Sequence, residues 1–347
     1  MTVHADIIPV SWARADGHTP LADVVTRPGT RAVLLGGSRD PNAKVTLVLL
    51  DDYGPAFVVK VATTGTAAQV VRNEGALLEA LAGAGLGRLA PTLPRAIGYL
   101  SADGLPALVT TALTGVPMTV RYHGWRHIAR RRRVRADFAA AGAWLADLQA
   151  RSAGPPAPVT LLADSLETIT TRFAGHPALP ALTDRLAASA QVLAGHATPR
   201  TIVHGDYWFG NLLLADGRVV GVVDWECGAL TGEPLRDVAR FPVSYALYLD
   251  RHTRPGRRVR GHRQLRADSW GAGIAYAVNG RGWFPEVVRR YLADALTRLG
   301  LPAELSRDVL IAGIAEVAAT ADHPDFARDH LEVLARILDS TVDGGVP

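Results

Sequence analysis

The residues with the clearest chemical potential in this sequence stand between positions 204 and 226. They form two polar strings, His204-Gly205-Asp206-Tyr207-Trp208-Phe209-Gly210-Asn211 and Asp224-Trp225-Glu226. In the first string the aspartate follows the histidine by two residues, and the asparagine follows the aspartate by five. This spacing is that of loops in which the aspartate accepts the proton of a phosphoryl acceptor and the asparagine holds Mg²⁺. It predicts Asp206 as a general base and Asn211 as a magnesium ligand.

The sequence between the two strings predicts that Asn211 and Asp224 meet in space. Residues 212–214 and 218–223 are apolar runs joined through Ala215-Asp216-Gly217, and Asp-Gly between such runs is a strong hairpin signal. Both polar residues then lie at the open end of the hairpin. An amide oxygen and a carboxylate are hard oxygen ligands suited to Mg²⁺, so Asp224 is predicted as the second magnesium ligand. The alternative is a solvated turn in which an aspartate caps its own backbone.

An upstream lysine and glutamate are expected to form an ion pair. Residues 56–61 read as a strand that carries Lys60, and a helix is predicted from about 66 to 81. Glu74 falls on the apolar face of that helix, and a carboxylate there needs a partner because its burial is otherwise costly. Lys60 is predicted to be that partner, as in the strand-lysine to helix-glutamate pair that positions nucleotide phosphates. Two independent surface charges are the alternative.

Composition bounds the class of protein. The chain has 347 residues, of which 48% are hydrophobic, which is enough for two lobes with cores of their own. It contains no apolar run of the roughly 18 residues that a membrane span needs, and its first ten residues lack the pattern of a secretion signal. We expect a cytoplasmic protein without an integral membrane segment. The single cysteine, Cys227, excludes an internal disulfide and a cysteine-based zinc cluster.

The net charge of +4 arises from an unusual set of basic residues. Only Lys44 and Lys60 are lysines among the 37 basic residues, and an ammonium offers phosphate a compact point charge that a guanidinium does not. Arginines gather at 126–135, interpreted as the solvated start of a helix, and at 251–263, in a loop expected either to border the substrate or to be plain surface. No nucleic-acid-binding motif accompanies them, so no nucleic acid partner is expected.

The order of elements predicts an α+β fold with two lobes. Strands are expected at 31–35, 43–50, 56–61 and 105–111, and helices at 137–150, 163–174, 179–194, 234–249 and onward to about 340, with breaks at Pro285, Pro302 and Pro324. A small strand-rich nucleotide-binding lobe (1–113) would join a large helical lobe (114–347) through a hinge near 111–117. The large lobe would carry the catalytic loop, the metal motif and the acceptor site.

Two further segments are expected to contact a nucleotide. The loop Gly36-Gly37-Ser38 stands between two predicted strands, and a glycine-rich loop there can lay backbone N–H groups over phosphates. A simple hairpin turn is an equal alternative. Adenine is expected to meet backbone groups in the hinge, from Thr111 to Leu113.

These residues resemble the aminoglycoside phosphotransferase-like kinase family, which also includes choline and other small-molecule kinases. The resemblance rests on Val203 to Asp206 with Asn211, on Val223-Asp224-Trp225-Glu226 and on the segment 232–239, and it covers residues 30–250. It implies a bilobal protein-kinase-like fold and O-phosphorylation that depends on ATP or GTP and Mg²⁺. The glycine-rich loop departs from the family pattern, and the C-terminal third is too divergent for acceptor residues to be carried over.

The resemblance also assigns roles by position. Asp206 would be the base, Asn211 and Asp224 the Mg²⁺ ligands, and Lys60 the phosphate lysine held by Glu74. His204 would be a structural member of the catalytic loop and Asp237 the carboxylate that steadies it. Glu226 would assist the metal directly or through water, or cap a helix.

The leading hypothesis is a phosphotransferase acting on a hydroxyl of a small metabolite, most simply a sugar or amino sugar. The alternatives are a nucleotide-binding regulatory module, which would be marked by loss of Asp206, Asn211, Asp224 or Lys60, and a kinase of protein or lipid-linked acceptors. The arginines at 251–263 favour a neutral, anionic or singly cationic acceptor over a polycation. The late acidic residues Glu316, Asp322, Asp325 and Asp329 are interpreted as solvated helix ends. Four aromatic residues near the motifs, Tyr207, Trp208, Phe209 and Trp225, would stack on a sugar ring or pack the core.

Overall fold

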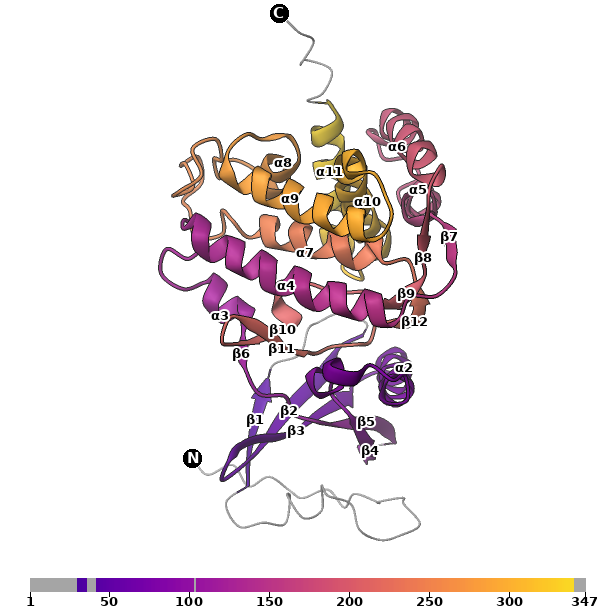
Figure 1. Cartoon of the computed structure of the whole chain (residues 1–347), viewed down its shortest axis with the longest axis vertical. Helices are drawn as coiled ribbons and strands as arrows, with labels where there is room; N and C mark the ends of the chain where they lie inside the picture. The colour runs from indigo at the N-terminus through magenta and orange to yellow at the C-terminus, as the bar shows by residue number, and fades with distance from the viewer. Residues whose placement is uncertain (1–29, 36–41, 103, 340–347) are drawn as a thin grey trace, which may run out of the picture. The chain divides into compact units, whose positions relative to one another are not determined.

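The computed structural model describes residues 30–35, 42–102 and 104–339, which fall into two compact units (Figure 1). The N-terminal unit comprises Met1–Thr114 and Val220–Cys227, and the C-terminal unit comprises Gly115–Val219 and Gly228–Pro347. The segment Val220–Cys227 therefore groups with the N-terminal residues, although the sequence analysis assigned it to the second lobe.

The N-terminal unit contains a five-stranded antiparallel sheet with one long helix packed on it. The strand order is β1-β2-β3-β5-β4, with β1 Arg31–Leu35, β2 Lys44–Asp51, β3 Gly54–Ala62, β4 Ala96–Ala102 and β5 Leu105–Thr111. Helix α2 (Gly65–Ala82) and the 3-10 turn η1 (Gly87–Thr92) connect β3 to β4. The four predicted strands are confirmed. Strand β4 was not predicted; its register with β5 shifts between Ala96 and Gly98, where Gly98 has a φ of +158°.

The alternation of β3 places Lys60 on the face opposite Phe57 and Val59. Phe57 and Val59 join a buried cluster with Leu49, Ala107 and Val109. Lys60 points to the other face because successive strand side chains alternate, and α2 packs there.

Helix α2 begins where the hydroxyl oxygen of Thr64 accepts the N–H of Ala67 at 3.0 Å, a side-chain cap of the first turn. The predicted helix is confirmed, and its buried stripe includes Val71, Glu74 and Leu78. A Cβ on Gly75 would lie 1.9 Å from the hydroxyl oxygen of Tyr99, so glycine lets α2 approach β4 closely.

The C-terminal unit is mainly helical. Its helices are α3 (Met118–Tyr122), α4 (Arg131–Arg151), α5 (Leu161–Arg172), α6 (Leu179–Ala194), α7 (Leu235–Leu247), α8 (Ala272–Asn279), α9 (Trp283–Arg298), α10 (Ser306–Thr320) and α11 (Pro324–Asp339), with 3-10 turns η2 (Phe209–Asn211) and η3 (Ala303–Leu305). Helix α10 packs against α5, α7 and α11, and its residues from Val309 to Ala319 are all buried (Figure 1). It therefore forms the centre of the helical core.

Short strands flank residues 204–211, which are predicted to form a catalytic loop. They are β6 (Val116–Pro117), β7 (Pro156–Pro158), β8 (Ala197–Pro199), β9 (Thr201–Val203), β10 (Leu212–Ala215), β11 (Arg218–Val222) and β12 (Ala229–Gly232). Strand β9 pairs with β12, and β10 lies between β11 and β6. The predicted hairpin is confirmed: Asp216 and Gly217 both have positive φ, +49° and +75°, as its two-residue turn requires. The boundary between the two units falls within β11.

None of the helices in the described ranges combines the length and the apolar composition required to cross a bilayer.

Two buried histidines in the C-terminal unit are held in the neutral form. His262 donates from Nε2 to the carbonyl of Ile128 at 2.9 Å, and His330 donates from Nδ1 to the carbonyl of Phe326 at 2.8 Å. The other ring nitrogen of each has no hydrogen-bond partner among the described residues. Burial lowers the pKa of each imidazole to about 4, because the charged form would lose its hydration.

These histidines predict that acid destabilises the protein. Between pH 6.5 and 4 the unfolded chain binds protons that the folded chain does not, so stability falls as the pH falls, by about 2 kcal/mol per histidine at pH 5. Urea unfolding at pH 7.5 and pH 5.0 measures this loss. His330→Asn is expected to be less stable at pH 7.5 but to lose less on acidification. His323→Asn, which removes an exposed imidazole just before α11, is the control. An unchanged pH dependence in His330→Asn would contradict the assignment.

Candidate active site

The N-terminal unit places an ammonium between two carboxylates. Lys60 Nζ lies 2.6 and 2.7 Å from the two carboxylate oxygens of Glu74 and 2.7 Å from Oδ1 of Asp224. Glu74 is 2% exposed, so the predicted pair with Lys60 is confirmed and is buried. Burial alone would lower the pKa of Lys60, but the charges of Asp224 and Glu74 outweigh it and raise that pKa above its ordinary value. Lys60 therefore carries a full positive charge.

A second lysine joins the same cluster. Lys44 on β2 forms an ion pair with Glu226, a contact that the sequence analysis did not predict. Burial and the charge of Asp224 raise the pKa of Glu226, and Lys44 opposes that shift. Both lysines of the chain thus lie among these carboxylates.

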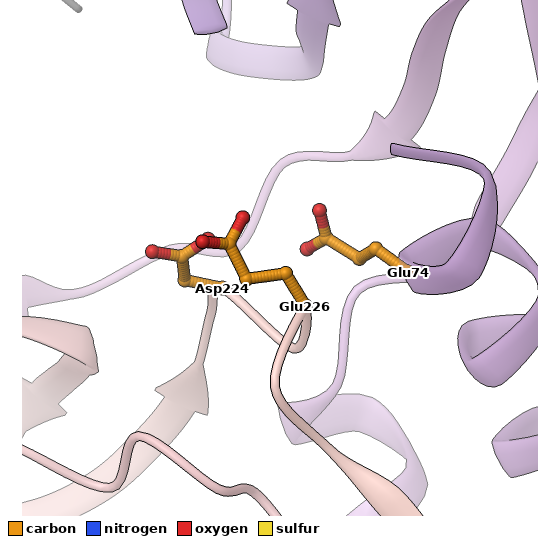
Figure 2. Close-up of side chains that lie close together, drawn as sticks. All are labelled: Glu74, Asp224 and Glu226. Carbon is orange, nitrogen blue, oxygen red and sulfur yellow. The ribbon is translucent and has the colours of Figure 1, made fainter. Parts of the chain in front are cut away.

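Three carboxylates converge in this cluster. One oxygen each of Glu74, Asp224 and Glu226 lies within 4.8 Å of the others. Figure 2 shows them side by side, Glu74 coming from α2 and the other two from the segment after β11. Two ammonium groups balance three carboxylates, which leaves one net negative charge, and the Asp224 side chain is 38% exposed. Such oxygen donors fit a hard divalent cation.

Local backbone structure explains why the segment Val220–Cys227 belongs to the N-terminal unit. The backbone N–H of Trp225 donates to Glu74 at 3.1 Å, and its indole N–H donates to the carbonyl of Val222 at 3.0 Å. The Trp225 side chain is fully buried. Asp224 adopts a φ of +69°, a left-handed conformation that aspartate tolerates better than most residues. The turn therefore holds the Asp224 carboxylate beside Lys60.

In the C-terminal unit, Asp206 is held from both sides. Arg240 Nε donates to Asp206 Oδ1 at 2.8 Å, and Arg240 Nη2 lies 2.8 Å from the same oxygen. The Asn211 amide donates to the Asp206 backbone carbonyl at 3.0 Å and to Oδ2 at 3.3 Å. The predicted base and the predicted asparagine ligand are thus in direct contact. Arg240 was not predicted, although it follows Asp237 by three residues on the same helix.

The catalytic loop is fixed through its backbone. Asp237 accepts the N–H groups of His204 at 2.7 Å and Gly205 at 2.9 Å, and the N–H of Asp206 donates to His204 Nδ1 at 3.2 Å. His204 and Asp237 are both buried. Burial raises the pKa of Asp237, while His204 and the two N–H groups act in the opposite direction. Asp237 and His204 therefore occupy the positions expected of a steadying carboxylate and a structural loop histidine.

The aromatic residues near the motifs pack mainly into cores. Tyr207 and Phe209 are at most 1% exposed; Tyr207 stacks on Trp144 with centroids 5.6 Å apart, and Phe209 stacks on Tyr122 at 4.5 Å. Trp225 is also buried, so Trp208 is the one of these four residues that is partly exposed, and its ring lies 6.4 Å from that of Tyr248.

The other predicted nucleotide contacts have different outcomes. Gly36, Gly37 and Ser38 lie outside the described residues. Thr111 ends β5, and its N–H donates to the carbonyl of Arg95 at 3.0 Å. Leu113 follows in the connector, which has no regular structure there. The N–H of Thr111 is therefore used by the sheet.

One acidic residue near the C-terminus is misassigned by the sequence analysis. Glu316 was interpreted as a solvated helix end, but it is 5% exposed and forms an ion pair with Arg236 of α7. Burial raises the pKa of Glu316, and Arg236 opposes that shift. The partner lies on another helix, so periodicity within α10 gave no sign of it.

Comparison with known proteins identifies the family. Residues 40–272, about two thirds of the chain, match the model of the phosphotransferase enzyme family. The chain belongs to this family. It is therefore an enzyme that transfers a phosphoryl group to a hydroxyl group of a small molecule, as the sequence analysis predicted. No curated protein sequence matches the chain.

The solved structure of APH(4)-Ia shows the same fold. A thermostable mutant of aminoglycoside phosphotransferase APH(4)-Ia, in a ternary complex with AMP-PNP and hygromycin B, has a TM-score of 0.55 and 12% identity, with 91% of this chain and 94% of that chain covered. The apoenzyme of macrolide 2'-phosphotransferase MphH from Brachybacterium faecium has a TM-score of 0.48 and 18% identity, with 89% and 92% covered. The predicted α+β fold, with a strand-rich N-terminal region and a helical C-terminal region, is confirmed.

The geometry around Lys60 predicts strong coupling between two mutations. Glu74→Ala removes the partner that orients Lys60, so Lys60→Ala and Glu74→Ala should each lower kcat/KM for the nucleotide. The loss in the double variant should be well below the sum of the single losses in free energy. Steady-state kinetics on the four proteins measure the coupling, and Glu79→Ala, at an exposed position of α2, is the control. Additive losses would show that the pair does not act as a unit.

Proposed function

We propose that this phosphotransferase transfers the γ-phosphate of ATP to a hydroxyl of a sugar or amino sugar, with GTP as the alternative donor. The observation that carries the proposal is Lys60, whose ammonium bonds both the buried Glu74 and the partly exposed Asp224. In kinases such a lysine positions nucleotide phosphates next to a metal-binding aspartate. The ternary complex of APH(4)-Ia with AMP-PNP and hygromycin B supports the choice of an adenine nucleotide.

Asp224 and Asn211 would hold Mg²⁺, with Glu226 assisting. The carboxylate donors fit this ion, because Asp224 is accessible and the cluster keeps one net negative charge beside its two ammonium groups. The amide nitrogen of Asn211 is already used on Asp206, so its oxygen is the group that would serve the metal. Glu74 is the least suited of the three carboxylates, since both its oxygens bind Lys60. Bound Mg²⁺ would neutralise charge on the transferring phosphoryl group.

Asp206 would be the base. It is anchored by Arg240 and Asn211 and remains 27% exposed, so a hydroxyl can reach it. The acceptor oxygen would form a bond to the γ-phosphorus as the bond to the leaving ADP oxygen breaks, and the proton would pass to Asp206. Lys60 would hold the nucleotide phosphates during this step.

A cavity in the C-terminal unit supports the acceptor class. Its volume is about 480 Å³, and it is lined by Leu247, Tyr248, Asp250, Arg251, Thr253, Pro255, Ala267, Asp268, Ser269, Trp270, Gly271 and Phe326. Tyr248 contacts the rings of Trp208 and Phe209, so the cavity adjoins the catalytic loop. Burial and the charge of Asp268 raise the pKa of Asp250. Two carboxylates and a single arginine suit at most one ammonium group on a sugar ring, which Trp270 would stack against.

Phosphorus NMR of the protein with Mg-ATP tests the proposal. The acceptor panel is glucose, glucosamine, hygromycin B, streptomycin and choline. A new phosphomonoester signal is expected with glucose or glucosamine, at higher kcat/KM than with the two antibiotics. Preferential phosphorylation of hygromycin B or streptomycin would overturn the acceptor class.

Asp206→Asn is predicted to lower kcat by about 10² to 10⁴-fold, the usual contribution of a positioned base. Nucleotide affinity should stay within about threefold, because the contacts of Lys60 are untouched. Calorimetry gives the affinity and coupled-assay kinetics give kcat. Asp216→Asn, in the hairpin turn, is the matched control. Unchanged turnover would remove Asp206 from the reaction.

Asp224→Ala is predicted to abolish the dependence of nucleotide affinity on Mg²⁺, because the neutral Asn211 amide is a weak ligand by itself. Titration of ATP with and without a chelator measures this dependence by calorimetry, independently of turnover. Asp52→Ala, which removes an exposed carboxylate of the N-terminal unit, is the control. An equal response to Mg²⁺ in wild type and Asp224→Ala would place the metal elsewhere.

A further inference from the structure

Helix α7 holds the catalytic loop at two points on one face. Asp237 accepts two backbone N–H groups of the loop, and Arg240 bonds the side chain of Asp206. Residues three positions apart share a helix face, so the aspartate and the arginine reach the loop together. The first contact fixes where the loop runs. The second fixes how the Asp206 carboxylate is turned.

The Arg240 contact distinguishes the two oxygens of Asp206. Nε and Nη2 of Arg240 both lie 2.8 Å from Oδ1, whereas Oδ2 has one longer contact, at 3.3 Å, with the amide of Asn211. Arg240 and Asp206 side chains are 20% and 27% exposed, so the pair is shielded from water more than an ordinary surface ion pair. Hydrogen bonds between charged groups at this distance are strong and directional. Oδ2 is therefore the oxygen with capacity for a further proton.

We propose that Arg240 is a positioning residue that locks Asp206 so that Oδ2 receives the acceptor proton. The inference rests on the proposed function, in which Asp206 is the base. As the acceptor oxygen bonds to phosphorus and the ADP oxygen leaves, the proton passes to Oδ2 while Oδ1 stays bound to the guanidinium. Arg240 contributes through orientation, since a misplacement of about 1 Å can lower a rate by about 10²-fold.

The alternative is that Arg240 only fastens α7 to the loop. A matched arginine on the same helix separates the two roles. Arg236 lies one turn earlier on α7 and pairs with the buried Glu316 of α10. Loss of either arginine removes an ion pair of α7, but only loss of Arg240 should change how Asp206 works.

The test measures turnover of Mg-ATP with the best acceptor of the panel, or with water as acceptor, for Arg240→Ala, Arg240→Lys and Arg236→Ala. Arg240→Ala is expected to lower kcat by about 10²-fold with KM for ATP within about threefold. Arg240→Lys should be intermediate, because an ammonium cannot present two N–H groups to Oδ1 in the same plane. Arg236→Ala should lower the melting temperature but keep kcat within about threefold.

Two further measurements distinguish an Arg240 that orients the Asp206 carboxylate from an Arg240 that only attaches α7 to the loop. Added guanidinium ion should restore kcat of Arg240→Ala by at least about tenfold and in a saturable way, and should not raise kcat of Arg236→Ala. In the Asp206→Asn background, Arg240→Ala should cause no further loss, because Arg240 acts through that carboxylate. Melting curves show whether Arg240→Ala is folded, and Arg240→Lys replaces it in both readouts if it is not.

The outcomes separate the two proposals. If the wild-type enzyme turns over ATP and Arg240→Ala has the same kcat, the positioning role of Arg240 is overturned, while the proposed function stands. Additive losses in the double variant, or absence of rescue in folded protein, overturn it as well. Absence of ATP turnover by wild type with every acceptor and with water overturns the proposed function, and the role of Arg240 with it.

Discussion

The N-terminal unit depends on the ammonium of Lys60 lying between the carboxylates of Glu74 and Asp224. Burial of Lys60 or Glu74 without an opposite charge would be strongly unfavourable, so these two groups must come together as the unit forms, and the more exposed Asp224 adds a second carboxylate to Lys60. The interaction ties strand β3, helix α2 and the segment after β11, although Lys60 and Asp224 are separated by 164 residues. The contact proposed to arrange groups for phosphate and metal is thus also the one that joins Val220–Cys227 to this unit. The same three side chains would then serve both stability and the proposed chemistry.

The C-terminal unit uses a different constraint, the match between one face of α7 and the catalytic loop. Beyond Asp237 and Arg240, the ring of Phe241 lies 6.2 Å from that of Tyr207, and the ring of Tyr245 lies 5.7 Å from that of Phe209. Positions 237, 240, 241 and 245 follow helical periodicity, while their partners are consecutive or nearly so along an irregular segment. A rigid helix therefore serves as the template for a loop that has little regular structure of its own. Because α7 is rigid, the side chains of residues 206, 207 and 209 keep fixed positions although their segment is irregular.

Contacts between residues close together in the sequence could be predicted, whereas several contacts between residues far apart could not. The sequence predicts the pair of Lys60 and Glu74 because a carboxylate on an apolar helix stripe needs a partner, and the preceding strand carries a lysine. The hairpin followed from Asp216-Gly217. The pairs of Lys44 with Glu226 and of Arg236 with Glu316 join residues 182 and 80 positions apart, and no periodicity reports such contacts. The contact of Arg240 with Asp206 was not predicted, because arginine is so common in this chain that its residue type does not single out position 240. Strand β4 was missed because Gly98, a weak strand former, interrupts its short run of residues.

The scarcity of lysine has an experimental consequence. Apart from the chain's N-terminal amine, the only aliphatic amines in the sequence are those of Lys44 and Lys60, and both stand in the carboxylate cluster. These two lysines are the only side chains that reductive methylation with ¹³C-formaldehyde can label, and both would report on the same few ångströms of the protein. Lys60 should react slowly, because its raised pKa keeps the amine protonated. A reagent normally regarded as unselective thereby becomes a spectroscopic probe of a single site.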